Sequence, residues 1–181
     1  MYWAYIMNEY KVFGLSKKVD DKFLSWLGSL GNIVGMASRT LWGIFMDIIS
    51  FKLAFGVITG MQLLNSLTIY FIASNKWCYV TWIGVMYLVG CGNFVCVNIQ
   101  CSINYGKFGE KVFGLAATGM ALSTFSTMFV EFFILETFGF MITFYFLSIM
   151  NLLAFIFSRL VVKERISVNA ADKTVPLIDN Q

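Results

Sequence analysis

The chain has 181 residues, of which 59% are hydrophobic and only 13% are charged, and its net charge at neutral pH is +3. A soluble domain of this length would be about half apolar and about one-quarter charged, so the composition excludes an ordinary soluble domain and favours a bilayer as solvent. The chain contains no histidine, which argues against a zinc centre or a histidine base. We expect no metal, no cofactor, no enzymatic activity and no nucleic-acid partner.

The N-terminal segment, residues 1–22, is predicted to form a short helix followed by a loop on the outer side of a membrane. Residues 1–15 are aromatic, but they are too short to span a bilayer alone and they include Asn8, Glu9 and Lys11. Two interpretations remain open. The segment is either a helix lying at the membrane interface or the end of a longer span.

A bundle of about five transmembrane helices is predicted over residues 23–163. The apolar runs are 23–46, 53–73, 77–103, 112–135 and 138–158. Each is long enough to cross a bilayer, which takes about 20 residues. Helices are expected because each backbone polar group must be satisfied within its own segment. The connections at 47–52, 74–76, 104–111 and 136–137 are short, so neighbouring helices must be antiparallel. The predicted fold class is an all-α, multi-pass membrane protein.

The distribution of lysine and arginine predicts the orientation of this bundle. Lys52, Lys107, Lys111, Arg159 and the basic residues after it fall on one side, which carries seven such residues against five on the other. This bias places the C-terminus in the cytoplasm. Residues 164–181 are mostly polar and are predicted to be a disordered cytoplasmic tail. The sequence leaves open whether the membrane is the plasma membrane or that of an organelle.

The first apolar run carries an arginine on a face rich in glycine. At ~100° per residue, one wedge of the helix holds a row of small and polar residues: Gly28, Gly31, Asn32, Gly35 and Arg39. The glycines favour close approach of another helix. Arginines at this depth usually mark a ligand or ion pathway, and a planar guanidinium fits a carboxylate or phosphate. The alternative is a structural arginine bonded to helix carbonyls or to Glu131.

Other polar residues at membrane depth have two interpretations each. Glu131, near the end of the fourth run, is either a carboxylate at the outer interface or a group for proton coupling or gating. Asn32 and Asn93 either line a substrate pocket or bond to neighbouring helices. A row of small residues on the fourth run predicts a helix-packing seam: Gly114, Ala117, Ala121 and Thr124.

One motif resembles a known transporter family. Residues 39–47, RTLWGIFMD, followed by Phe51-Lys52, are similar to the end of the eighth helix and the next cytoplasmic turn in major facilitator superfamily transporters. The branch that it most resembles contains the oxalate/formate antiporters and monocarboxylate transporters. The segments DDKFLSWLGSLGNIVG and NYGKFGEKVFGLAATG are also similar to that branch. The resemblance extends over most of residues 12–163.

The resemblance implies that the five runs correspond to helices eight to twelve of a twelve-helix transporter, and residues 1–15 to the end of the seventh. Arg39 would then engage a substrate carboxylate, and Gly43, Asp47 and Lys52 would belong to the cytoplasmic turn motif. Related oxalate carriers place a second basic residue in the eleventh helix. Residues 112–135 have none, which favours a monocarboxylate. Substrate would bind between two six-helix halves, so a missing N-terminal half or a second copy is an expected partner.

The predicted function is transport of small organic anions by alternating access, as half or a fragment of a secondary carrier. The partners are the bilayer and the anion. The coupling ion, and the choice between uniport, symport and antiport, stay open. The alternative is a non-transporting, truncated membrane protein or an assembly partner of other membrane proteins.

Overall fold

The computed structural model describes residues 1–161, which are 94% helical and contain no strand. The prediction of an all-α chain is confirmed over this range. The predicted tail, residues 164–181, lies outside the described residues.

The first two helices meet at a tight turn. α1 spans Tyr2–Ser16 and α2 spans Asp21–Ile48. The Asp20 carboxylate accepts a hydrogen bond from the backbone N–H of Phe23 at 3.2 Å. This bond caps α2 by satisfying one of the N–H groups that a helix start leaves free.

The next two helices also begin at side-chain caps. α3 spans Phe51–Ile72 and α4 spans Lys76–Tyr105. Ser50 and Asn75 accept hydrogen bonds from backbone N–H groups in the first turns of these helices. Such caps end one helix and start the next within a few residues, and they place both turns inside the predicted connections.

The second half of the chain departs from the predicted boundaries at one point. Its elements are the 3₁₀ turn η1 (Gly106–Phe108), α5 (Gly109–Phe129), the π-helix η2 (Val130–Leu135) and α6 (Glu136–Val161). The predicted connection at residues 136–137 is wrong, because both residues are helical. Backbone of non-helical conformation occurs instead at Gly139, where φ is 75° and ψ is 177°. Glycine adopts this positive φ without steric cost.

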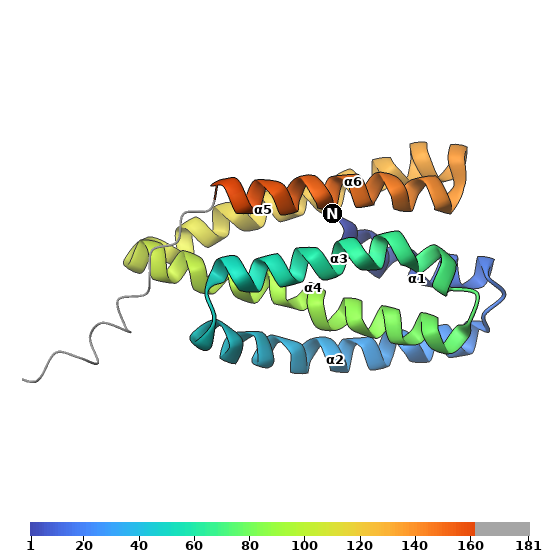
Figure 1. Ribbon diagram of the computed structural model, residues 1–181, viewed down its shortest axis with the longest axis horizontal. Helices are drawn as coiled ribbons and strands as arrows, with labels where there is room; N and C mark the ends of the chain where they lie inside the picture. Colours follow the sequence, from blue (N-terminus) through green and yellow to red (C-terminus); the bar gives the residue numbers. More distant parts are fainter. Residues whose placement is uncertain (162–181) are drawn as a thin grey trace, which may run out of the picture.

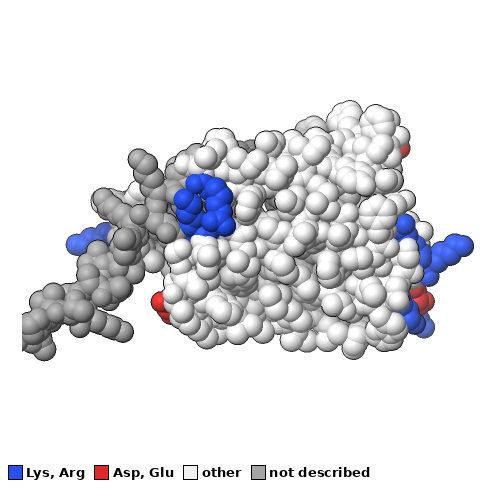
Figure 2. All heavy atoms as spheres, viewed as in Figure 1, with Lys and Arg blue, Asp and Glu red and all other residues white. Residues whose placement is uncertain are grey.

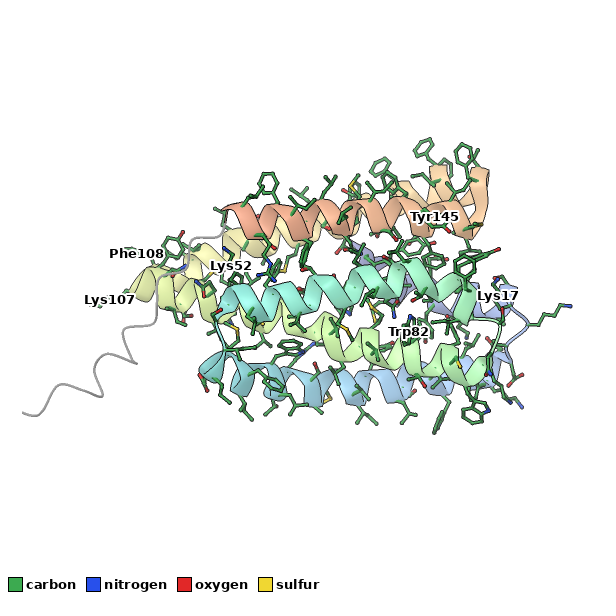
Figure 3. The ribbon with its side chains drawn as sticks, viewed as in Figure 1. Lys17, Lys52, Trp82, Lys107, Phe108 and Tyr145 are labelled. Atoms are coloured by element: carbon green, nitrogen blue, oxygen red, sulfur yellow. The ribbon has the colours of Figure 1, made fainter. Side chains whose placement is uncertain are left out.

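Successive long helices run antiparallel along one bundle axis (Figure 1). Lys52 and Lys107 lie at one end of the bundle and Lys17 at the other (Figure 3). The two sets of basic residues that the sequence predicts on opposite sides thus separate to opposite ends. Which end faces the cytoplasm stays a prediction.

The helices present an apolar surface. Figure 2 shows charged side chains towards the two ends of one face, with a broad uncharged band between them. Large apolar residues such as Leu115 (74% exposed) and Phe157 (68% exposed) contribute to this surface. By length and composition, two helical stretches could cross a membrane: Phe51–Ile72, and the run Lys76–Leu160 that contains α4, α5 and α6.

Helix α1 packs one side into the bundle, while residues such as Val12 and Leu15 on it are exposed. It begins near the middle of the bundle's length and runs to the end where α2 starts (Figure 1). Tyr2, Tyr5, Ile6 and Phe13 of α1 are at most 1% exposed and belong to the main apolar core. Whether residues 1–15 lie at a membrane interface or end a longer span stays a prediction.

Buried polar side chains join the helices inside this core. The Tyr2 hydroxyl donates to Asn65 Oδ1 at 2.5 Å, and Asn65 Nδ2 donates to the Trp82 carbonyl at 3.1 Å. Between α3 and α6, the Ser148 hydroxyl donates to Ser66 Oγ at 2.8 Å. Such bonds hold helices in register where apolar packing alone would let them slide.

Candidate functional site

The glycine face of α2 packs on α4, which is the helix whose close approach the glycines predict without identifying it. A Cβ at Gly31 would lie 2.2 Å from the Tyr87 ring, and one at Gly35 would lie 3.0 Å from Cys91 Sγ. A Cβ at Gly28 would likewise lie 2.2 Å from the Tyr10 hydroxyl oxygen of α1. Only residues without a side chain allow this approach, so the glycines set the distance between α1, α2 and α4.

Two donors from α2 bond to one carbonyl of α4. The Ser38 hydroxyl and the Trp42 indole both donate to the Leu88 carbonyl, the second at 2.9 Å. The Trp42 ring lies over Gly92, where a Cβ would come within 2.7 Å of it. These contacts fix the part of α2 that carries Arg39 against α4.

A cavity of about 740 Å³ lies beside this packed face, between α1, α2 and α4. Arg39, Asn32 and Gly35 of α2 line it, together with Tyr87 and Cys91 of α4. The other lining residues are Trp3, Met7, Tyr10, Ser25, Gly28, Ser29 and Met36. The cavity is large enough for a small organic molecule, and its lining mixes aromatic rings with hydroxyl, amide and guanidinium groups.

Arg39 is exposed and directed to this cavity. Among residues 1–161, no hydrogen bond or ion pair engages its guanidinium, and Glu131 is not its partner. Asp47 lies about 12 Å further along the same helix, too far for a direct ion pair. The structural alternative for Arg39 thus finds no partner in the described range. Its donors remain available for an anion, which a guanidinium can hold with two parallel bonds.

The two asparagines predicted to line a pocket, Asn32 and Asn93, differ in their position relative to the cavity. Asn32 lies two turns before Arg39 on α2 and lines the cavity with it. Asn93 is half-buried on α4, and it is not among the residues that line the cavity. The structure therefore brings Asn32 and Arg39 together and leaves Asn93 outside this group.

The turn motif lies at the opposite end of α2 from Asp20. Gly43 is half-buried with open space around its Cα, and Asp47 is exposed in the last turn of α2. Ile49 is extended and Ser50 caps α3, so that Lys52 falls in the first turn of the next helix. The motif thus occupies a helix–helix turn, as the sequence predicts.

Glu131 lies in the π-helix η2, away from Arg39. Its side chain is partly buried, and its Oε1 atom is shielded from solvent with no hydrogen-bond partner in the structure. A carboxylate oxygen in this state is costly in an apolar environment unless a proton or a cation neutralises it. Glu131 is thus a second polar site, separate from the cavity.

Comparison with known protein families, curated proteins and solved structures finds no match to this chain. The likeness to the major facilitator superfamily therefore rests on the residues quoted above.

The sequence reasoning missed the cavity residues contributed by α1. Trp3, Met7 and Tyr10 recur at intervals of four and three residues, which places them on one helix face. That periodicity and the high aromatic content of residues 1–10 could have predicted a wall of a site.

Proposed function

We propose that this chain forms part of a membrane carrier for small organic anions, with a monocarboxylate as substrate. The proposal treats α2 to α6 as five membrane-crossing helices. It is supported by the antiparallel arrangement, the apolar perimeter and the charged residues towards the two ends (Figure 2). The lysine and arginine bias orients the C-terminus to the cytoplasm.

The observation that carries the proposal is the guanidinium of Arg39, which lines the cavity with no partner among the described residues. A carboxylate at this point would gain charge-assisted hydrogen bonds from the guanidinium, which can be bidentate. Asn32 and the Tyr10 hydroxyl supply further polar groups, and the rings of Trp3 and Tyr87 supply an apolar wall. This set suits a small anion with an organic body.

During transport, the cavity would open first to one side of the membrane and then to the other. The helix pair α2 and α4 would move as a unit against a second half of the carrier, or against a second copy of this chain. The turn motif at Gly43, Asp47 and Lys52 would then secure the cytoplasmic side in one of the two states. Such rocking around a fixed midplane site is how carriers built from repeated halves work.

The test is uptake of radiolabelled monocarboxylates by liposomes that contain the protein. We expect Arg39→Ala to lower uptake on the order of 10- to 100-fold, the value of a charge-assisted hydrogen bond. Arg39→Lys is expected to fall nearly as far, because an ammonium lacks the planar fork. Arg159→Lys is the matched control, since Arg159 packs near Gly56 at the α3–α6 contact and away from the cavity. Undiminished uptake in both Arg39 variants would overturn the assigned role.

A second candidate, an assembly partner, is favoured by the surface of α5. Gly109 and Thr127 are its only buried residues, and a Cβ at Gly114 or Gly119 would meet no atom within 4 Å. In the predicted small-residue seam, Gly114, Ala121 and Thr124 are exposed and Ala117 is half-buried, so most of the seam is open. A second helical unit could dock on it at short range.

This candidate predicts that the protein is oligomeric in mild detergent and that Gly114→Leu makes it monomeric. Sedimentation velocity with detergent correction measures the change. Gly60→Leu is the control, because Gly60 on α3 is equally open but lies outside the seam. A wild-type protein that is already monomeric would contradict this candidate, because the seam on α5 would then bind no second protein unit.

A further inference from the structure

Two tyrosine hydroxyls lie at one turn of α2, beside the cavity. The Tyr10 hydroxyl of α1 packs against Gly28, where a Cβ would be 2.2 Å from its oxygen. The Tyr87 ring of α4 packs against Gly31, one turn further along α2, and its Cζ atom would be 2.5 Å from a Cβ there. Because the hydroxyl of tyrosine is attached to Cζ, it also lies at this turn. Tyr10 and Tyr87 both line the cavity.

Neither of these hydroxyls has a hydrogen-bond partner within residues 1–161, and neither is among the polar atoms sealed from solvent. Buried tyrosine hydroxyls usually find a partner. Two others in this protein do so, since Tyr2 donates to Asn65 and Tyr79 donates to the backbone carbonyl of Tyr10. Tyr87 is only 6% exposed. Its unbonded hydroxyl is therefore reachable through the cavity that the residue lines.

The serine hydroxyls of the same cavity are already used within α2. Ser25 donates to the Asp21 carbonyl at 3.0 Å, and Ser29 donates to the Ser25 carbonyl at 3.3 Å. Among the described residues that line the cavity, the hydroxyl hydrogens left for a ligand are thus those of Tyr10 and Tyr87. We call these two groups the phenol pair.

Arg39 lies apart from the phenol pair along the same wall of the cavity. It follows Gly31 by about two turns of α2, or ~12 Å. The side chain of a helical residue leans towards the N-terminal end of its helix, which here is the direction of the phenol pair. A ligand that contacts both groups must therefore be several bonds long. Acetate is too short to do so.

We propose that the substrate is a monocarboxylate with a hydroxyl or carbonyl oxygen at the far end of its carbon chain. Its carboxylate binds Arg39, and its terminal oxygen binds the phenol pair. A phenol both donates and accepts hydrogen bonds, so the pair suits either kind of oxygen. A second carboxylate would stay uncompensated, because Arg39 is the basic residue among the described lining residues. This inference specifies the substrate of the proposed carrier and rests on that proposal.

The test is isothermal titration calorimetry of the protein in lipid nanodiscs, with hexanoate and its terminal-hydroxy derivative as probes. We expect the terminal-hydroxy acid to bind roughly 3- to 10-fold more tightly, which is the value of one net hydrogen bond. Hexanoate with its hydroxyl on the carbon next to the carboxylate is the matched control ligand. It should bind no more tightly than hexanoate, because that hydroxyl lies at Arg39 and away from the phenol pair. Equal preference for both hydroxy acids would overturn the proposal.

Tyr10→Phe and Tyr87→Phe each remove one hydroxyl and keep the ring. We expect each to lower the ratio of the two affinities, terminal-hydroxy acid over hexanoate, and the double variant to bring it close to one. Tyr145→Phe is the matched control, since Tyr145 lies on α6 outside the cavity lining (Figure 3); it should keep the wild-type ratio. Both acids are measured on one preparation, so the ratio does not depend on the folded fraction. A wild-type ratio in the double variant would overturn the role of the phenol pair.

The same titrations distinguish failure of this inference from failure of the carrier proposal. Suppose that wild-type protein binds hexanoate and its terminal-hydroxy derivative equally, and that Arg39→Ala abolishes binding of both. The carboxylate site then stands and the phenol pair is rejected. If neither acid binds to the wild-type protein, the carrier proposal fails and this inference fails with it.

Discussion

Replacing Phe13 by alanine is expected to destabilise the helix bundle by about 2–3 kcal/mol. The Phe13 ring is 1% exposed and packs 4.9 Å from the Phe144 ring and 5.0 Å from the Phe140 ring, both on α6. It also contacts Tyr79 of α4 and Tyr70 of α3. One side chain therefore joins α1 to three other helices, and its loss leaves a cavity that none of them can close alone.

In the proposed carrier, lipid is as apolar as the core, so the expected value lies below the range of about 3–5 kcal/mol for Phe→Ala in the core of a soluble protein. The loss is then one of packing rather than of transfer from water. The loss of stability is measured by titrating the protein with sodium dodecyl sulfate in mixed micelles and following its unfolding by circular dichroism. Phe157→Ala is the control: Phe157 is 68% exposed, so its truncation should change stability by about 0.5 kcal/mol or less. Equal losses in both variants would contradict the assignment of Phe13 to the core.

Replacing Gly90 by valine is expected to destabilise the protein by about 1–3 kcal/mol through overpacking. A Cβ at this position would lie 1.7 Å from Cδ1 of Trp3 and 2.1 Å from its indole nitrogen. Trp3 also makes an edge-on contact with Phe94, at 6.0 Å between ring centroids. Its ring therefore has to leave its place, and because Trp3 lines the cavity, the shape of the cavity changes as well.

Gly84→Val provides a control on the same helix. A Cβ at Gly84 would meet no atom within 4 Å, so the same substitution adds a side chain without a clash. The same detergent titration compares the two variants. A Gly84 variant as unstable as the Gly90 variant would show that helix propensity causes the loss instead of the contact with Trp3.

The helices and their order could be predicted from the sequence because each apolar run is bounded by polar residues. The caps at Asp20, Ser50 and Asn75 fall where those boundaries occur. The close approach of a helix to α2 was also predictable, since Gly31 and Gly35 recur at helical spacing. The sequence did not identify that helix as α4.

The features that escaped prediction depend on tertiary contacts. Residues 1–15 lack the length of a span, and only the packing of Tyr2, Tyr5 and Phe13 with the other helices shows that they belong to the core. The π-helix has no pattern in a single sequence. The helix runs through Glu136 and Thr137 to Gly139 because these residues carry no proline or glycine to stop it. The small-residue seam at Gly114 showed where a helix could pack, but not which helix.

The hydroxyl groups of α5 have a consequence for how this protein can change shape. Thr118, Thr124, Ser126 and Thr127 all donate to carbonyls of α5 itself. Moving this helix outward therefore leaves these donors satisfied. In the proposed carrier, lipid could replace the protein neighbours of α5 at the expense of dispersion contacts alone, so lipid composition would influence the position of this helix.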